Sequence, residues 1–300
     1  MSTESEVITV IPGEEVLRRP ARGLIGWLSD QEAAGALLGR NPKPGEDISQ
    51  YIAVAAECRA AVQSRPVFEQ LDPIVERVLP GLDEVSARQD VASTLGPLNW
   101  RPAVVDLRRV LSFQKVIHVD GLEDRVGHVS DDRSLLELCI PTEQPSVPVG
   151  AFTDQDGKGF TVSSFNPNLR IAGGQVSEAQ VSQVPGIPAV KMQAITLLVF
   201  MGASFLQIVR YKDRSFIRDG NHRAAGLIRR GIFEVPCIFI EAKSFDEVGA
   251  ASGTFSYETL YGDRPPGLAD FWQEDVSRPI QQLAVRKVVR VRGEEFVVPR

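Results

Sequence analysis

The stretch Asp219-Gly220-Asn221-His222-Arg223 combines residue types that bind phosphate groups. Gly220 permits a positive φ angle and a close approach of the main chain to a ligand. A helix that begins after this glycine presents unpaired N–H groups, which attract anions. The side chains of His222 and Arg223 add donors that can carry positive charge. The stretch therefore predicts a phosphate-binding turn at the start of a helix.

The sequence around the turn is locally basic, although the chain as a whole is acidic. The 300 residues carry a formal net charge of −6 with a pI near 5.3, so the average surface repels polyanions. This favours a local phosphate site over wholesale nucleic-acid binding, which would need a segregated basic face. An ordinary tight turn before a solvated basic helix face is the alternative interpretation. The basic residues of the segment are Arg210, Lys212, Arg214, Arg218, Arg223, Arg229 and Arg230.

Strands and a helix are predicted around the turn. Apolar and β-branched runs lie before it, and small or apolar residues at helical spacing follow it. Gly231 is placed to end the helix, because glycine is favoured just after the last turn. The predicted order is a strand at 205–209, a turn at 212–214, a strand at 216–218, a helix at 222–230 and a buried strand at 234–240.

The run 195–240 resembles the ParB/sulfiredoxin superfamily, whose members share a strand, an Asp-Gly-x-His-Arg or Gly-x-x-Arg turn, a helix and a Val-Pro strand. The residues that carry the resemblance are the turn at 219–223 and Val235-Pro236-Cys237-Ile238. Members bind ATP, ADP or CTP with this turn, and they include sulfinic-acid reductases, free-serine kinases and CTP-switched partition clamps. The resemblance implies an α+β fold with a ParB/sulfiredoxin-like mixed sheet.

The same resemblance implies a set of nucleotide-binding residues. The family's upstream strand, which ends near a Gln-containing loop, matches residues 104–107 and 112–114. We expect Arg223 to lie exposed in the first turn of the helix, where its guanidinium can make bidentate contacts with a phosphate. The residues that would bind the nucleotide are Gly220, Asn221, His222, Arg223, Arg218 and Gln114.

Phosphoryl transfer requires positioning, electrostatic stabilisation and a carboxylate that activates the acceptor. Asp219 and Asp106 are the candidates for this carboxylate, and His222 is the third candidate catalytic residue. We expect ATP or another nucleotide as the cofactor, together with Mg²⁺, and a small molecule as the substrate. The predicted function is phosphoryl transfer or hydrolysis on that small molecule.

Other functions are weighed against this one. A non-catalytic nucleotide-sensing or partner-binding module is the main alternative. A CTP-dependent DNA-binding protein is less favoured, because no basic helix-turn-helix is visible after Glu241. Sulfinic-acid reduction is disfavoured, since Asn221 stands where sulfiredoxins carry a catalytic Cys. A Fic nucleotidyltransferase is disfavoured because Ser215 and His222 replace residues of its motif.

Changes in composition predict three segments: a helical N-terminal extension at 1–95, a ParB/sulfiredoxin-like core with a long insertion at 96–250, and a C-terminal extension with a hairpin at 251–300. Other elements are predicted from periodicity and turn formers. They are a helix that opens at 47–50, helices at 73–79 and 189–200, a strand at 103–107, a hairpin at 147–165, a long loop at 166–188 and a final hairpin at 285–298.

Composition predicts a folded, cytoplasmic protein without a membrane partner, and no residues are predicted as ligands of a protein-bound metal. Hydrophobic residues make up 43% of the chain and charged residues 24%, which is typical of globular proteins. Cys58, Cys139 and Cys237 show no CxxC spacing, which fits a reducing cytosol, and Cys237 is expected to be buried and inert. His118 lies in an apolar stretch and is interpreted as a packed polar residue. The apolar run 194–209 is too short and too interrupted to span a bilayer.

Overall fold

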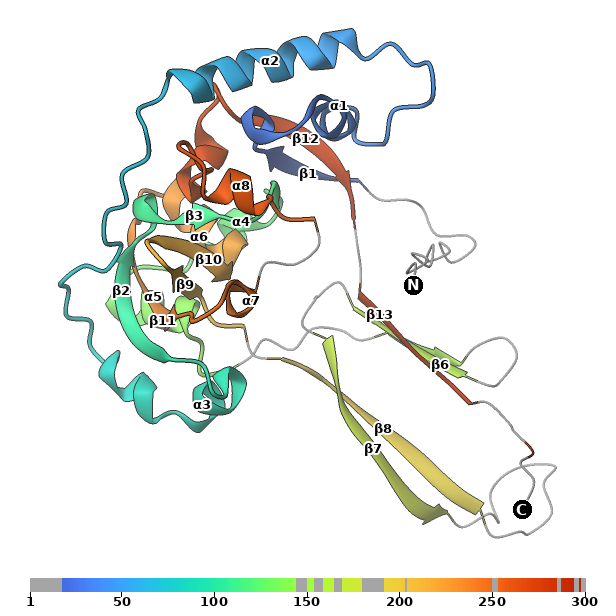
Figure 1. The fold of residues 1–300 in the computed structure, drawn as a ribbon. Coiled ribbons are helices and arrows are strands. Elements are labelled where there is room, and N and C mark those ends of the chain that lie inside the picture. Colours follow the sequence, from blue (N-terminus) through green and yellow to red (C-terminus); the bar gives the residue numbers. More distant parts are fainter. Residues whose placement is uncertain are drawn as a thin grey trace.

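The computed structural model describes residues 18–143, 150–153, 159–164, 169–179, 192–202, 204–249, 253–284, 287–293 and 297. These residues form helices that pack against mixed sheets (Figure 1). The predicted α+β class is therefore confirmed.

The central sheet has five strands in the order β2-β11-β9-β10-β3. β11 lies antiparallel to β2 and parallel to β9, and β10 lies antiparallel to β9 and parallel to β3. The four strands predicted around the turn and at 103–107 all belong to this sheet. The five strands of the sheet are β2 (Trp100–Asp106), β3 (Leu111–Ser112), β9 (Gln207–Tyr211), β10 (Arg214–Asp219) and β11 (Glu234–Glu241).

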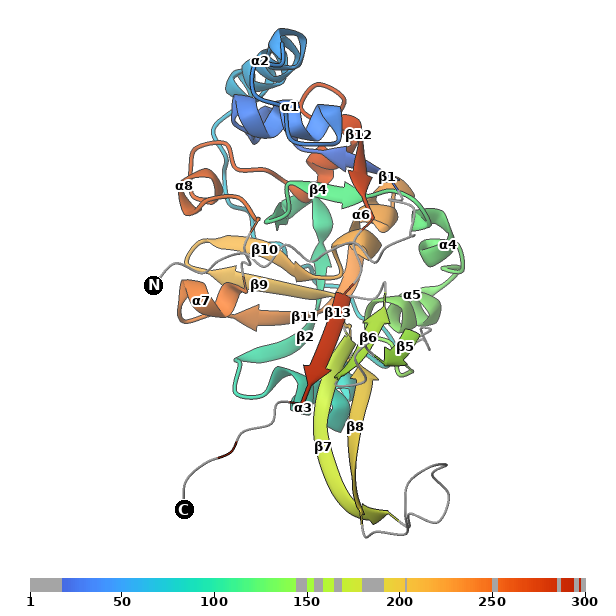
Figure 2. The ribbon, with the colours of Figure 1, turned by 90° about the vertical axis from the view of Figure 1, so that its right-hand side faces the viewer.

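Helices surround the sheets, and the view in Figure 2 shows α1 and α2 at one end of the molecule and α4 and α5 along one side. The α-helices are α1 (Asp30–Leu38), α2 (Ser49–Ser64), α3 (Gln89–Leu95), α4 (Leu122–Val126), α5 (Asp132–Cys139), α6 (Asn221–Arg229), α7 (Phe245–Val248) and α8 (Tyr257–Leu260). Short 3-10 helices are η1 (Ile25–Trp27), η2 (Asp83–Ala87), η3 (Leu107–Arg109) and η4 (Leu268–Trp272).

Helix α6 links β10 to β11 and confirms the helix predicted after the turn. Its small and branched side chains Ala224, Ala225 and Leu227 are buried in the core. Gly231 has a φ of 77° after the last turn, as expected for the residue that ends a helix. α6 also contacts α4 and η4.

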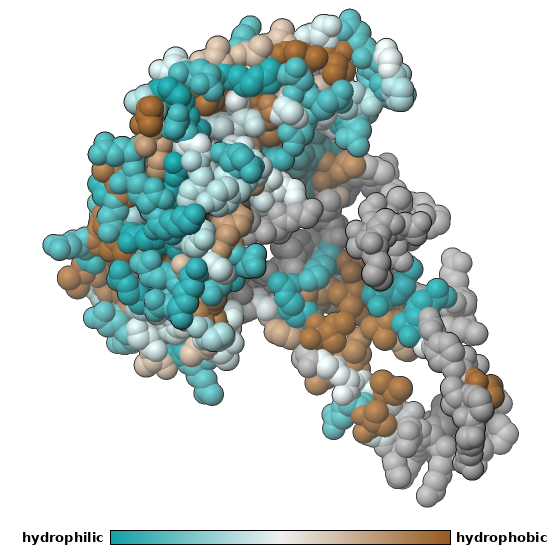
Figure 3. Space-filling view, in the orientation of Figure 1, coloured by the Kyte–Doolittle hydropathy of each residue, from teal (hydrophilic) through white to brown (hydrophobic). Residues whose placement is uncertain are grey.

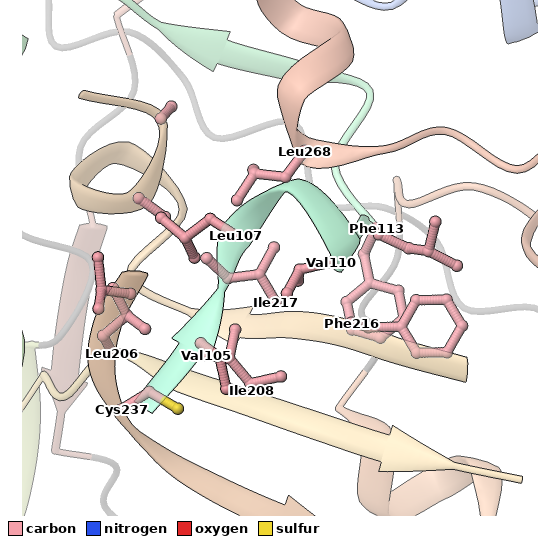
Figure 4. Packing of buried hydrophobic residues seen from close by; sticks show 14 of the residues in the cluster. Val105, Leu107, Val110, Phe113, Leu206, Ile208, Phe216, Ile217, Cys237 and Leu268 are labelled. Carbon is pink, nitrogen blue, oxygen red and sulfur yellow. The ribbon is translucent and has the colours of Figure 1, made fainter. Parts of the chain in front are cut away.

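The hydrophobic core lies between the central sheet and its helices. Figure 4 shows Val105, Ile208, Ile217 and Cys237, which come from four neighbouring strands, packed side by side. Burial raises the pKa of Cys237 well above its usual value, so the thiol stays protonated. The prediction that Cys237 is buried is confirmed.

A second sheet joins distant parts of the chain. It has the order β12-β1-β4, with both pairs antiparallel. Its strands come from all three segments that the sequence distinguishes. They are β1 (Arg18–Gly23), β4 (Val116–His118) and β12 (Arg278–Leu283). α1 packs on β12, and α2 packs on α1 and confirms the helix predicted to open at 47–50.

The remaining described strands form two small sheets at one side of the molecule (Figures 1 and 2). One of the two is a long ribbon that projects from the rest of the structure. One sheet has the order β13-β6-β5, and the ribbon is the antiparallel pair β7-β8. Figure 3 shows apolar side chains on the surface of this region. The bounds are β5 (Gly150–Thr153), β6 (Gly159–Ser164), β7 (Leu169–Ala179), β8 (Met192–Met201) and β13 (Lys287–Arg292).

The β7-β8 ribbon corrects two predictions. The helix predicted at 189–200 is wrong, because residues 192–201 form strand β8. Ile195, Thr196 and Val199 are β-branched, which favours a strand, and cross-strand pairing outweighed the helix-forming residues beside them. The loop predicted at 166–188 is wrong for residues 169–179, which form β7, while 180–188 lie outside the described residues.

One further prediction differs from the structure. The helix predicted at 73–79 is wrong, because these residues are described and form no helix. They run beside β2 instead: Ile74 forms a β-bridge with Val105, and the main-chain N–H of Val75 donates to the main-chain oxygen of Val104 at 3.0 Å. The first strand of the predicted final hairpin at 285–298 corresponds to β13, which pairs with β6. Most of its second strand, at 296–298, lies outside the described residues. The predicted hairpin at 147–165 is confirmed by the antiparallel pair β5 and β6, as far as its residues are described.

None of the helices in the described ranges combines the length and the apolar character needed to cross a lipid bilayer.

Candidate functional site

The turn between β10 and α6 has the conformation that phosphate binding requires. Gly220 has a φ of 86°, in the left-handed region, and α6 begins at the next residue. A Cβ atom at position 220 would lie 3.1 Å from the Cα of Leu206. Both the φ angle and this close approach therefore require glycine.

The N-terminus of α6 carries no side-chain cap and no acidic residue in its first turn. Its first N–H groups consequently keep the partial positive charge that a helix N-terminus presents. Asp219 precedes the helix and accepts a hydrogen bond from its neighbour, the N–H of Gly220, at 2.7 Å. Its other carboxylate oxygen accepts from the hydroxyl of Ser204 at 3.4 Å.

Arg223 is held by other parts of the protein. Its Nη1 donates to the main-chain oxygen of Leu138 at 3.0 Å, and its Nη2 donates to the hydroxyl of Ser204 at 2.7 Å. Burial lowers the pKa of the guanidinium. The expectation that Arg223 lies exposed in the first turn is therefore wrong: the side chain ties α6 to the end of α5.

His222 contacts a histidine that the sequence did not connect with the turn. Its Nε2 accepts a hydrogen bond from the main-chain N–H of His118, with an N···N distance of 3.2 Å. The two rings are stacked, with centroids 5.8 Å apart and planes 6° from parallel. The two residues are 104 positions apart in the chain, and no sequence motif relates them.

His222 is uncharged at neutral pH. Burial lowers its pKa to about 4, and the nearby charges of Arg125, His118 and Arg19 act in the same direction. At neutral pH His222 can therefore offer an N–H donor to a phosphate but no positive charge. Positive charge in this region comes from the guanidinium group of Arg223 and from those of Arg125 and Arg19, although Arg19 forms an ion pair with Asp120 at 2.7 Å.

Gln114 lies on the same edge of the sheet as the turn. β3 runs parallel to β10, with Leu111 opposite Phe216 and Ser112 opposite Ile217. Gln114 follows two residues later, in the direction in which β10 leads to Asp219. The side chain is half-buried, and its main chain forms a bridge with Thr254.

Arg218 and Asn221 flank the turn in different environments. Arg218 donates through Nη1 to Oε1 of Gln207 at 3.0 Å, and burial lowers its pKa. A Cβ atom on Gly249 would lie 2.9 Å from its Nε, so the guanidinium packs against that main chain. Asn221 is buried, with an exposed fraction of 7%, and its Oδ1 has no partner in the described structure.

Asp106 lies at the opposite end of α6 from the turn. It is opposite Glu234, which follows the end of α6, in the pairing of β2 with β11, whereas Asp219 lies two residues before the first residue of α6. The nine residues of α6 extend about 13 Å. Asp106 accepts from Nη2 of Arg108 at 2.7 Å and from its main-chain N–H at 3.0 Å. The structure therefore does not bring this candidate catalytic carboxylate to the turn.

The arrangement can hold an anion, with main-chain N–H groups at the start of α6, an uncharged imidazole beside them and guanidinium groups nearby. In the described part of the chain, no cluster of three or more His, Cys, Asp or Glu side chains is arranged to bind a metal ion. No family model matches the chain, and no match was found among curated proteins or solved structures.

Proposed function

We propose that this protein binds a nucleotide or another phosphorylated small molecule at residues 219–223 and transfers or hydrolyses a phosphoryl group there. The observation that carries the proposal is the uncapped N-terminus of α6 directly after left-handed Gly220. A phosphate at this position would accept hydrogen bonds from several main-chain N–H groups and interact with the helix dipole. The succession of β10, turn, α6 and β11 also supports a ParB/sulfiredoxin-like core.

Asp219 is the carboxylate that we assign to catalysis. It lies at the turn itself, and its two oxygens already accept hydrogen bonds from Gly220 and Ser204, which orient the group. A Mg²⁺ ion that accompanies the nucleotide takes oxygen ligands, which Asp219 could supply. Asp106 is assigned a structural role, because its hydrogen bonds from Arg108 hold the start of η3.

A nucleotide-sensing module without turnover is the second candidate. The observation that favours it is the separation of Asp106 from Asp219 by the length of α6. Only one of the two predicted carboxylates is then available at the turn. We also propose a reducing, cytoplasmic environment, which the free and buried thiols of Cys58, Cys139 and Cys237 support.

Calorimetric titration with ATP, ADP and CTP, followed by assays of phosphate release with and without Mg²⁺, tests the proposal. Asp219→Asn should lower turnover at least about a hundredfold while the protein stays folded. Asp106→Asn is the matched control: it should lower the free energy of unfolding, because Arg108 loses its partner, yet leave turnover per folded molecule unchanged. Binding without turnover would favour the sensing module, and the absence of binding by all three nucleotides would contradict both.

A further inference from the structure

We propose that the main-chain N–H of His118 fixes His222 in the tautomer that carries its proton on Nδ1, so that His222 serves the turn as an uncharged hydrogen-bond donor. The donor role rests on the proposed function, whereas the tautomer rests on the structure alone. The motivating contact is the 3.2 Å hydrogen bond from the main-chain nitrogen of His118 to Nε2 of His222.

A main-chain N–H can only donate, so the ring nitrogen that faces it must offer a lone pair. Nε2 of His222 is therefore unprotonated, and the proton of the neutral ring must reside on Nδ1. A side-chain hydroxyl or amide at this place could rotate and accept a hydrogen bond from a protonated Nε2. The main-chain N–H of His118 cannot accept a hydrogen bond.

The position of the donor follows from the covalent structure of histidine. Nδ1 is the ring nitrogen nearer to the main chain, and His222 is the second residue of α6. Covalent geometry therefore keeps a proton on Nδ1 close to the main chain of the first turn, whose N–H groups have no side-chain cap. Among the described ring nitrogens of His118 and His222, the one that is buried without a hydrogen-bond partner is Nδ1 of His118.

The surrounding groups oppose a second proton on the ring. Arg125 from α4 and Arg19 from β1 are positive, and His118 stacks on the ring from β4. Asp120 acts in the other direction, but it is already paired with Arg19 at 2.7 Å. Protonation of Nε2 would also break the hydrogen bond to His118. His222 is thus suited to bind an anion and unsuited to shuttle protons.

The chain contains three histidines, which makes the ring nitrogens directly observable in protein labelled with ¹⁵N-histidine. We expect His222 to show a protonated Nδ1 and an unprotonated Nε2 from pH 5.5 to 8, with a scalar coupling between Nε2 and the main-chain nitrogen of His118. His118→Ala keeps the main-chain donor and should preserve the tautomer. His118→Pro removes it and should release the tautomer. A protonated Nε2 in the folded wild type at pH 7 would overturn the inference.

The donor role is tested by two substitutions that differ in where they place an amide N–H. The side-chain nitrogen of Asn lies near the position of Nδ1, and that of Gln near the position of Nε2. With ATP as the probe, His222→Asn should bind nearly as well as wild type, and His222→Gln about tenfold to hundredfold more weakly. Equal affinities of the two variants would overturn the donor role. Failure of the wild type to bind ATP, ADP or CTP, despite the expected Nδ1–H spectrum, would overturn the proposed function but not the tautomer.

Discussion

Nη2 of Arg223 donates a 2.7 Å hydrogen bond to the hydroxyl of Ser204, and the same hydroxyl contacts the carboxylate of Asp219 at 3.4 Å. The first turn of α6 is therefore connected through one serine to the acidic residue before the turn. This chain of polar contacts orients both charged groups that the site needs. It also means that Arg223 has a structural role in addition to any contact with a ligand.

Arg223→Ala should destabilise the fold. The substitution removes the hydrogen bond to Ser204 and leaves the main-chain oxygen of Leu138 without its donor. We expect the free energy of unfolding to fall by about 1–3 kcal/mol in urea titrations. Arg229→Ala changes an exposed arginine of the same helix, which contacts Glu123 at 3.5 Å and the ring of Trp272, and it should cost less than about 1 kcal/mol. Equal losses for both variants would show that the buried contacts of Arg223 contribute nothing.

Gly220→Ala should be more destabilising than Gly231→Ala, although both residues have positive φ angles. The φ angles are 86° and 77°, so the conformational cost of a side chain is similar, about 1–2 kcal/mol. A Cβ at 220 also meets Leu206 at 3.1 Å, whereas nothing lies within 4 Å of a Cβ at 231. The difference between the two variants in denaturant melts therefore measures the close approach at the turn. A larger loss for Gly231→Ala would contradict this packing.

The sequence predicted the elements that are specified by residues close together in the chain. Gly220, the apolar spacing of Ala224 and Leu227 and the glycine at 231 together specify turn, helix and helix end over a short stretch. Residues 235–240 of the strand that follows are apolar throughout, so their burial could also be predicted. Each of these features depends on neighbours in the sequence.

The missed features depend on distant contacts. The stacking of His222 on His118 is created by the path of β4, and no spacing rule relates the two positions. The burial of Arg223 depends on Leu138, at the end of another helix. Asp106 is separated from the turn by the antiparallel register of β2 and β11, which the sequence does not specify. In each case the residue type was a fair candidate, and its partner could be found only in three dimensions.

A disulfide cross-link can test whether residues 192–201 form strand β8 of the β7-β8 ribbon or the helix that the sequence pattern predicts. Val176 and Ile195 are directly opposite on the two strands, and both side chains are exposed. Directly opposite residues have Cβ atoms about 4.5–5.5 Å apart, close enough for a disulfide after a small adjustment. Val176→Cys with Ile195→Cys should therefore cross-link under mild oxidation, as seen by mass spectrometry of a digest. Val176→Cys with Phe200→Cys pairs positions that are out of register, and efficient cross-linking there would argue against the ribbon.

The depressed pKa of His222 predicts how stability changes with pH. The pKa is about 4 in the folded protein against 6.5 for an ordinary histidine, so the unfolded chain binds more protons between these values. Stability contributed by the neutral ring is thus fully present above about pH 6.5 and is lost as the pH falls toward 4.

Burial also lowers the pKa of His118, which adds to the same dependence of stability on pH. Glu32 and Glu46 have pKa values of about 2 in the folded protein against 4.5 for an ordinary glutamate, so the stability that they contribute begins to fall only as the pH approaches 4.5. The window from about pH 5 to 6.5 is therefore left to the histidines. His222→Asn should therefore lose less stability than wild type between pH 7 and pH 5 in urea titrations. His128→Asn changes an exposed histidine and serves as the control. If His222→Asn keeps the wild-type dependence of unfolding free energy on pH, His222 is not the source of that dependence.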